Sequence, residues 1–215
     1  MKEHVRCDYF PRFVELKGKD PSRGIVVATG HLGSFELLAH FVAISGYPLR
    51  FVVRDFKLPR LDRWWRGIRE AKGNRVISRK GAMEEVFAEL RAGRTVALLF
   101  DQNVTRNHAV SVHWSGRVAA TTRAVALAAI RTRATVLVSA ILHDGGDNYR
   151  IEVVERDCSS IYDDAQCATD EKVFRITEAI SRDYQQMILK QPEGWFWMHR
   201  RWKTSPAGTA EDFYD

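Results

Sequence analysis

A histidine and a glutamate lie five positions apart where an apolar run gives way to a helical pattern. His31 falls in a glycine-flanked turn, and Glu36 falls in the first turn of the expected helix. If the two side chains face each other, the carboxylate accepts a hydrogen bond from one imidazole nitrogen and leaves the other nitrogen as a base. N–H groups exposed at the helix start could stabilise an oxyanion. We therefore take His31 and Glu36 as candidate catalytic residues.

Other interpretations of this motif stay open. His31 could cap the helix while Glu36 complements the helix dipole, with no chemistry involved. Ser34 is better placed as a helix N-cap than as a nucleophile, because a Gly-x-Ser-x-Gly elbow is absent. The remaining histidines form no ligand pair at helical spacing, so we expect neither a metal site nor a cofactor.

Alternating strand-like and helical patterns surround the motif and must position it. The expected strands cover residues 25–28, 49–53, 76–77, 95–100, 110–114, 135–142 and 149–154. The expected helices cover residues 35–44, 61–72, 82–92, 122–131 and 169–190. This alternation predicts an α/β fold with a central, mostly parallel sheet flanked by helices. His31 and Asp101 both follow strands, at the ends where such sheets form their sites.

Length and composition favour one folded domain spanning residues 1–215. Apolar residues make up 45% of the chain and charged residues 28%, which excludes a disordered protein. No apolar run approaches the ~20 residues of a transmembrane helix, and the polar start does not predict a signal peptide. Cys7, Cys158 and Cys167 have a spacing that suits neither a zinc site nor a disulfide framework. We therefore expect a soluble or peripheral protein.

Positive charge is concentrated in two places. The net charge is +6, and residues 54–80 contain ten basic residues against three acidic ones. A second basic cluster covers residues 199–203. Such patches attract anionic lipids, nucleic acid or an acidic carrier protein. In the expected helix 61–72, Trp64 and Trp65 accompany a basic face, which suits an anionic membrane surface; the alternative is a tryptophan stripe that faces the core.

Five motifs together resemble a known family. They are the segment 29–36 with its His-x4-Glu spacing, the segments 53–67 and 90–102, the segment 116–122 before an Ala-rich helix, and the ending 192–203, Pro-Glu-Gly-Trp-Phe-Trp-Met-His-Arg-Arg-Trp-Lys. The chain resembles the lysophospholipid acyltransferase superfamily and, within it, the late (lauroyl and myristoyl) acyltransferases of lipid A biosynthesis. The resemblance covers residues 8–206, nearly the whole chain.

The resemblance implies a glycerolipid-acyltransferase-like fold and a reaction. His31 would deprotonate a hydroxyl of a lipid A precursor or related glycolipid, which attacks the thioester of an acyl carrier protein. Glu36 would orient the imidazole and stabilise its cation. The implied location is peripheral, on the cytoplasmic face of the bacterial inner membrane. Members usually carry a longer N-terminal region with a hydrophobic anchor, which we expect to be absent here.

Seven further residues are candidates for substrate binding. They are Arg54, Arg66, Asp101, Gln102, Arg200, Arg201 and Lys203. Arginine suits phosphate recognition because its guanidinium forms paired hydrogen bonds. Asp101 could instead orient a basic residue of the site, or form an Asx turn. The arginines could equally be ordinary solvated side chains.

Rival functions also stay open. A thioesterase would use water in place of the acceptor hydroxyl, and the acceptor could be a glycerolipid or a mannosylated lipid. A nucleic-acid-binding module could use the basic patch. We do not expect a nucleic-acid partner, because no recognisable motif for one is present and that function leaves the His31 turn unexplained.

Overall fold

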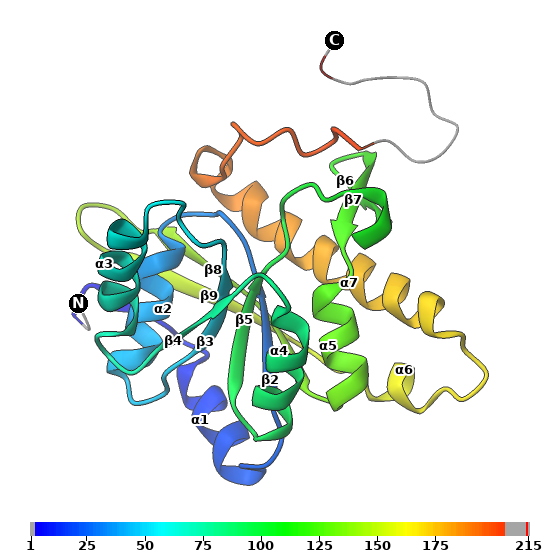
Figure 1. Cartoon of the computed structure of the whole chain (residues 1–215), viewed down its shortest axis with the longest axis horizontal. Coiled ribbons are helices and arrows are strands. Elements are labelled where there is room, and N and C mark those ends of the chain that lie inside the picture. The colour runs from blue at the N-terminus through cyan, green and yellow to red at the C-terminus, as the bar shows by residue number, and fades with distance from the viewer. Residues whose placement is uncertain (1–2, 205–213, 215) are drawn as a thin grey trace.

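Seven strands form the central sheet of the computed structural model, which describes residues 3–204 and residue 214 (Figure 1). Their order is β1-β9-β8-β2-β5-β3-β4, and all neighbours are parallel except β8 and β9. The strands are β1 (Val5–Arg6), β2 (Ile25–Thr29), β3 (Arg50–Val53), β4 (Arg75–Ser78), β5 (Thr95–Leu99), β8 (Thr135–His143) and β9 (Tyr149–Arg156). The predicted α/β class is confirmed.

The central strands are apolar because helices cover both faces of the sheet. β2 is buried along its whole length, and β5 along all but its last residue. Continuous apolar runs of this kind are typical of parallel strands covered on both sides. The register pairs Thr29 of β2 with Leu99 of β5. The loops that leave these two strands therefore lie side by side, at what we call the carboxyl edge of the sheet.

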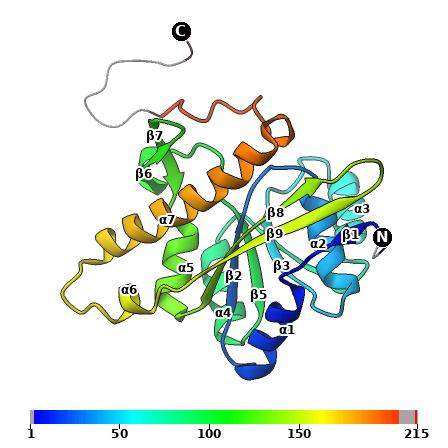
Figure 2. The same cartoon turned by 180° about the vertical axis from the view of Figure 1, so that it is seen from behind.

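Helices form the outer two layers (Figures 1 and 2). One core cluster includes Phe13 of α1 and Phe41 of α2, and a second includes Phe87 of α4, Ala128 of α5 and Ile180 of α7. The two clusters lie on opposite faces of the sheet. The helices are α1 (Phe10–Lys19), α2 (Phe35–Ile44), α3 (Pro59–Glu70), α4 (Ala82–Arg91), α5 (Ala124–Thr132), α6 (Ser159–Asp163) and α7 (Thr169–Lys190).

A separate antiparallel hairpin packs against α7 (Figure 1). It consists of β6 (Ala109–Trp114) and β7 (Arg117–Thr122). Two backbone N–H groups of the hairpin donate to side chains of α7: His113 to Glu178 at 2.9 Å and Ser115 to Gln185 at 2.6 Å. After α7, a 3-10 turn at Pro192–Gly194 directs the C-terminal segment across the carboxyl edge.

The predicted elements are all present, with ends shifted by a few residues. Four elements were not predicted, namely β1, α1, β7 and α6. Thr122, which was expected to lie in a helix, still belongs to β7. Ser34 does occupy the N-cap position of α2, but its side chain makes no capping hydrogen bond. In the described part of the chain, no helix has the length and apolar character needed to cross a bilayer.

Candidate active site

His31 and Asp101 form a hydrogen-bonded pair at the carboxyl edge. Nδ1 of His31 lies 2.8 Å from Oδ1 of Asp101. The backbone N–H of His31 also donates to the other carboxylate oxygen, Oδ2, at 2.7 Å. The His31 side chain is 22% exposed and that of Asp101 only 2%. The pair therefore has a buried carboxylate and an imidazole that substrate can reach.

The sheet register explains this contact. Thr29 pairs with Leu99 in the sheet. His31 lies two residues after Thr29, and Asp101 lies two residues after Leu99, so the two side chains leave the sheet at matched positions. Neighbouring parallel strands lie only about 4.8 Å apart, so side chains leaving at matched positions meet. The alternative that Asp101 orients a basic residue agrees with this contact. Its expected role in substrate binding stays a prediction, although its oxygens already accept protein donors.

Asp101 carries its charge in a buried position because donors surround it. Burial would raise the pKa of its carboxyl, but the hydrogen bonds and charge of His31, together with the hydrogen bond from Trp195, outweigh burial and lower the pKa below its usual value. The carboxylate is therefore ionised at neutral pH. An ionised carboxylate only accepts hydrogen bonds, so Nδ1 of His31 is the donor and Nε2 carries the lone pair.

The surroundings of Nε2 are partly apolar. The ring of Phe35 meets the imidazole edge-on at 5.0 Å between centroids, and the ring of Phe196 lies 6.1 Å away. The side-chain nitrogen of Gln102 lies 3.4 Å from Nε2. With Nδ1 donating to Asp101, Nε2 accepts this amide N–H, so Gln102 lies at the predicted site and contacts the imidazole nitrogen that would act as the base.

Glu36 does not contact the imidazole, so the predicted His31–Glu36 pair is wrong. Nε of Arg69 donates to the two carboxylate oxygens of Glu36 at 3.0 and 3.2 Å, and Nη2 adds a further bond to Oε1. A guanidinium forms stronger paired bonds with a carboxylate than a neutral imidazole does. The Arg69 guanidinium also lies over the Trp65 ring, 5.4 Å from its centroid. Glu36 therefore fixes α3 against α2.

Glycine is required at two points of the His31 turn. A Cβ atom at Gly30 would lie 2.5 Å from Cγ of Asp101 and 2.6 Å from the Tyr184 hydroxyl oxygen. Gly33 has a φ of +62°, and a Cβ atom there would lie 1.9 Å from the carbonyl oxygen of Ile141. Gly30 therefore makes room for the buried carboxylate.

The C-terminal segment contributes residues that the sequence analysis missed. Nε1 of Trp195 donates to Oδ2 of Asp101 at 2.9 Å. Nε2 of His199 accepts the backbone N–H of Asn103 at 2.6 Å, and burial lowers the pKa of His199. An accepting ring nitrogen carries no proton, in agreement with that direction. The Trp-rich C-terminal motif was the sequence signal for the Trp195 and His199 contacts. It did not indicate that their partners are Asp101 and Asn103.

Arg201 is buried rather than available to a phosphate, so that prediction is wrong. It is fully buried, and its guanidinium donates to the Ala120 carbonyl at 2.9 Å and to the Thr121 hydroxyl. The guanidinium also lies 4.3 Å from the centroid of the Trp114 ring. Burial lowers the pKa of Arg201 to about 10, so it remains a cation at neutral pH. Arg201 fixes the C-terminal segment to β7.

The remaining predicted substrate residues differ in how free their charges are. Arg66 forms ion pairs with Asp55 and, at 2.8 Å, with Asp62, so two carboxylates already neutralise its charge. Arg54 follows β3 at the carboxyl edge and, among the described residues, has no hydrogen bond or ion pair. Arg200 and Lys203 are exposed, and the Arg200 guanidinium lies 5.5 Å from the Tyr214 ring. Phosphate binding by these residues stays a prediction.

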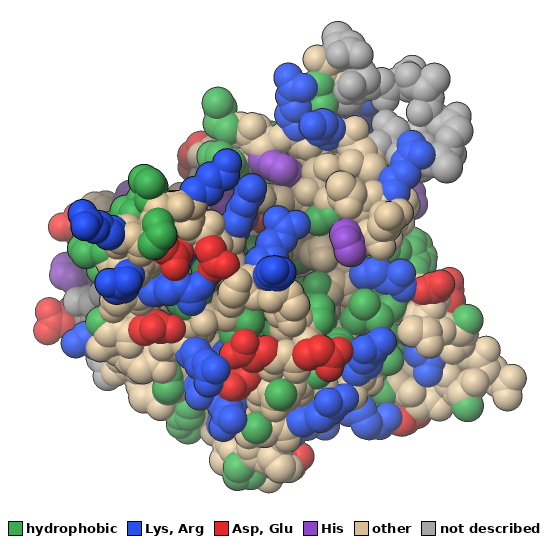
Figure 3. All heavy atoms as spheres, viewed as in Figure 1, with side chains coloured by type: hydrophobic (Ala, Val, Ile, Leu, Met, Phe, Trp, Pro, Cys, Tyr) green, Lys and Arg blue, Asp and Glu red, His purple; other side chains and the backbone are tan. Residues whose placement is uncertain are grey.

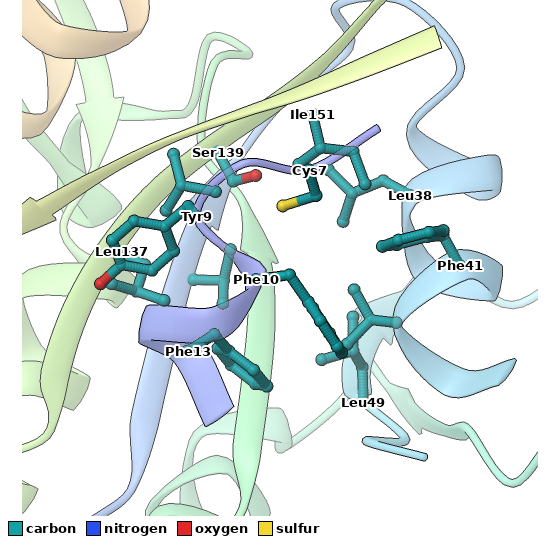
Figure 4. Close-up of a pocket in the computed structure, with 13 residues that line it drawn as sticks. Cys7, Tyr9, Phe10, Phe13, Leu38, Phe41, Leu49, Leu137, Ser139 and Ile151 are labelled. Carbon is teal, nitrogen blue, oxygen red and sulfur yellow. The ribbon is translucent and has the colours of Figure 1, made fainter. Parts of the chain in front are cut away.

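A pocket elsewhere is almost wholly apolar. Figure 4 shows it between α1 and α2, over β8 and β9, with Phe10, Leu38 and Ser139 among its lining residues. The described residues that line it include none of the predicted site residues. Within the described ranges, no group of three His, Cys, Asp or Glu side chains could bind a metal ion.

A family model described as bacterial lipid A biosynthesis acyltransferase matches residues 15–204. The matched range contains His31, Asp101 and Trp195, and it covers most of the chain. A comparison with curated proteins gives no match.

Proposed function

The chain belongs to the bacterial lipid A biosynthesis acyltransferase family, and from this premise we propose which groups it transfers and how. Membership makes it an O-acyltransferase of lipid A biosynthesis. We propose that the acyl donor is the thioester of an acyl carrier protein and that the acceptor is a hydroxyl of a lipid A precursor or related glycolipid. The observation that supports this most is the His31–Asp101 pair, with an imidazole that is 22% exposed and lies beside two aromatic rings.

The proposed chemistry is general-base catalysis by His31. The acceptor hydroxyl gives its proton to Nε2 while its oxygen attacks the carbonyl carbon of the thioester. The carbon–sulfur bond then breaks, and the departing thiolate takes the proton back from the imidazolium. The new ester forms directly, so no covalent acyl-enzyme is needed. The charge of Asp101 stabilises the imidazolium between the two proton transfers.

Exposed cations near the carboxyl edge are proposed to bind the anionic substrates. Arg54 follows β3, whose carboxyl end lies at the same edge as those of β2 and β5. In the part of the chain that the structure describes, this cation is exposed and has no ion-pair partner. A free guanidinium at this edge suits a phosphate of the acceptor or of the carrier's phosphate-linked thiol arm. Arg200 and Lys203 supply further positive charge on the C-terminal segment.

We further propose that α3 binds the membrane surface. Leu58, Leu61, Trp64 and Ile68 are exposed, and Trp64 is exposed by 59%. No residue of α3 is buried, whereas a core-facing tryptophan stripe would be. Figure 3 shows hydrophobic and basic side chains mixed over the α3 side of this face. Exposed apolar side chains among cations suit an anionic bilayer, which supports a peripheral location on the cytoplasmic face of the inner membrane.

The test is product analysis with purified protein. Acyl-carrier thioester is supplied with and without a lipid A precursor, and the lipids are identified by mass spectrometry. We expect an acylated precursor whose formation requires both substrates. Free fatty acid as the only product would contradict transfer and indicate a thioesterase. Acylation of a glycerolipid in preference to the precursor would contradict the proposed acceptor.

A further inference from the structure

The C-terminal segment pairs with the loop that carries His31. The backbone N–H of Gly33 donates to the Gly194 carbonyl, and that of Phe196 donates to the His31 carbonyl, both at 3.0 Å. Leu32 and Trp195 form an antiparallel bridge between these two bonds. Residues 194–196 therefore act as a short strand along the His31 turn, far from that turn in sequence.

The same segment also binds the loop after β5. His199 accepts the backbone N–H of Asn103, and the Asn103 side chain exchanges two hydrogen bonds with Thr204, both at 3.0 Å. The segment thus connects the loop that carries the imidazole with the loop that carries the carboxylate. Trp195 lies between them, 5% exposed, with its ring stacked on Trp114 at 5.8 Å.

The Trp195 side chain completes the binding of one carboxylate oxygen. Oδ2 of Asp101 accepts the N–H groups of the His31 backbone and of the Trp195 indole, at 2.7 and 2.9 Å. Oδ1 is left to the imidazole, at 2.8 Å. With Oδ2 bound on two sides, the carboxylate cannot rotate away from Nδ1 without losing both bonds. Leaving a buried carboxylate oxygen without its donors costs free energy. The orientation in which Oδ1 faces Nδ1 of His31 is therefore strongly favoured.

We propose that Trp195 is a positioning residue for acyl transfer, which fixes the Asp101 carboxylate against His31 through its indole N–H. This proposal rests on the proposed role of His31 as the base. Trp195 does not touch the reacting atoms. It acts by orienting the carboxylate and by drawing part of its negative charge away from the imidazole. Without the indole N–H, the carboxylate attracts the imidazolium more strongly but is less well oriented.

The first measurement is a double-mutant cycle in acyl transfer. Trp195→Phe keeps an aromatic ring and removes the N–H. We expect kcat to fall about 10-fold with little change in KM, because a change in rate of about 10-fold corresponds to the loss of about one hydrogen bond to a charged group. In an Asp101→Asn background, the same substitution should change kcat by less than about 2-fold, because the group through which Trp195 acts is gone. A merely structural role would lower kcat by the same factor in both backgrounds, and that result would overturn the proposal.

The second measurement does not depend on activity. The Nδ1–H proton of His31 is followed by NMR at constant pH, and in Trp195→Phe its exchange with water should become faster, because the carboxylate no longer holds this hydrogen bond in place. An exchange rate equal to that of wild type would overturn the proposal. If wild-type protein transfers no acyl group, the proposed function fails while this exchange measurement still tests Trp195, so the two failures are distinguishable.

Trp197→Phe is the matched control. Trp197 is in the same segment and touches the Trp195 ring, at 4.6 Å between centroids, but its indole N–H donates to the Pro192 carbonyl and not to Asp101. It should leave kcat and the exchange of the His31 Nδ1–H proton unchanged. If Trp195→Phe does not fold, β-(3-benzothienyl)alanine at position 195 retains the ring shape without the N–H, and the same two results decide.

Discussion

The imidazole of His31 and the carboxylate of Asp101 are hydrogen bonded at 2.8 Å although 70 positions separate them in the chain. Two parallel strands in matched register bring them together. The carboxylate is almost fully buried and carries a lowered pKa, so its charge is present throughout the neutral pH range. This relationship gives the His31 imidazole the defined tautomer that the proposed general base requires, and the predictions below for Asp101 and His31 depend on it.

Replacing Asp101 by asparagine should slow acyl transfer and change its pH dependence. The variant removes the charge that stabilises the imidazolium, so we expect a loss on the order of 10² in kcat or more. Protonated His31 becomes less stable without its anion, so the acidic limb of the pH–rate profile should move to lower pH. The measurement is kcat as a function of pH for wild type and variant, over about pH 5 to 9, which includes the range in which histidine side chains change charge.

Glu36→Gln is the comparison for that experiment. Glu36 pairs with Arg69 rather than His31, so this variant should keep the acidic limb of the wild-type profile. If Glu36→Gln moved the acidic limb and Asp101→Asn did not, Glu36 would be the partner of His31 in catalysis, and the observed His31–Asp101 pair would have no catalytic role.

The Glu36–Arg69 pair should instead be visible in stability. Both side chains are only partly exposed, Glu36 by 31% and Arg69 by 14%. A double-mutant cycle of Glu36→Gln and Arg69→Met, followed by urea unfolding, should give a coupling of about 1 kcal/mol once solvent screening is allowed for. Additive effects of the two substitutions would show that the pair does not fix α3 against α2.

How much of this site the sequence predicts can be argued from three residues. The strand-to-helix turn at His31 was predictable, because the apolar run before it and the glycines around it are local signals. The sequence placed Asp101 at the same edge of the sheet, but it could not show that Asp101 rather than the nearby Glu36 contacts the imidazole, because that contact depends on strand register. The alternation of strands and helices defines the class of fold, but it does not fix the alignment of two parallel strands.

Arg201 shows the same limit for the C-terminal motif. A basic ending looks solvated in sequence, yet the chain turns back at Pro192–Gly194 and places Arg201 beneath Trp114. Trp195, which also depends on this return of the chain, could not be linked to Asp101 without the fold. The missed strand β7 belongs with these residues, since its carbonyl at Ala120 accepts the Arg201 guanidinium.

Arg200 and Arg201 should therefore respond differently to substitution. Arg201→Lys loses the forked hydrogen bonds to β7 and part of the contact with Trp114, so unfolding free energy should fall by about 2–4 kcal/mol. Arg200→Ala should stay within about 1 kcal/mol of wild type while raising KM for the acceptor. Urea unfolding and acceptor titration separate the two effects. Equal destabilisation by both variants would contradict the structural role of Arg201.

Trp64 should contribute to membrane binding. Trp64→Ser removes an exposed indole from α3. We expect partitioning to vesicles containing anionic lipid to weaken about 10-fold, because burying such a side chain contributes about 1.5 kcal/mol of binding free energy. Leu189→Ser is the control, because Leu189 is exposed on α7 rather than α3. Sedimentation with vesicles is the assay, and equal weakening by the two variants would contradict a docking role for α3.

The catalytic role of His31 is tested most directly by the rate constant of acyl transfer for purified His31→Ala, measured under single-turnover conditions with saturating acceptor. Removal of the base should lower this rate constant on the order of 10²–10⁴-fold, while circular dichroism shows an unchanged fold. A folded His31→Ala protein that transfers acyl groups at the wild-type rate would contradict the mechanism.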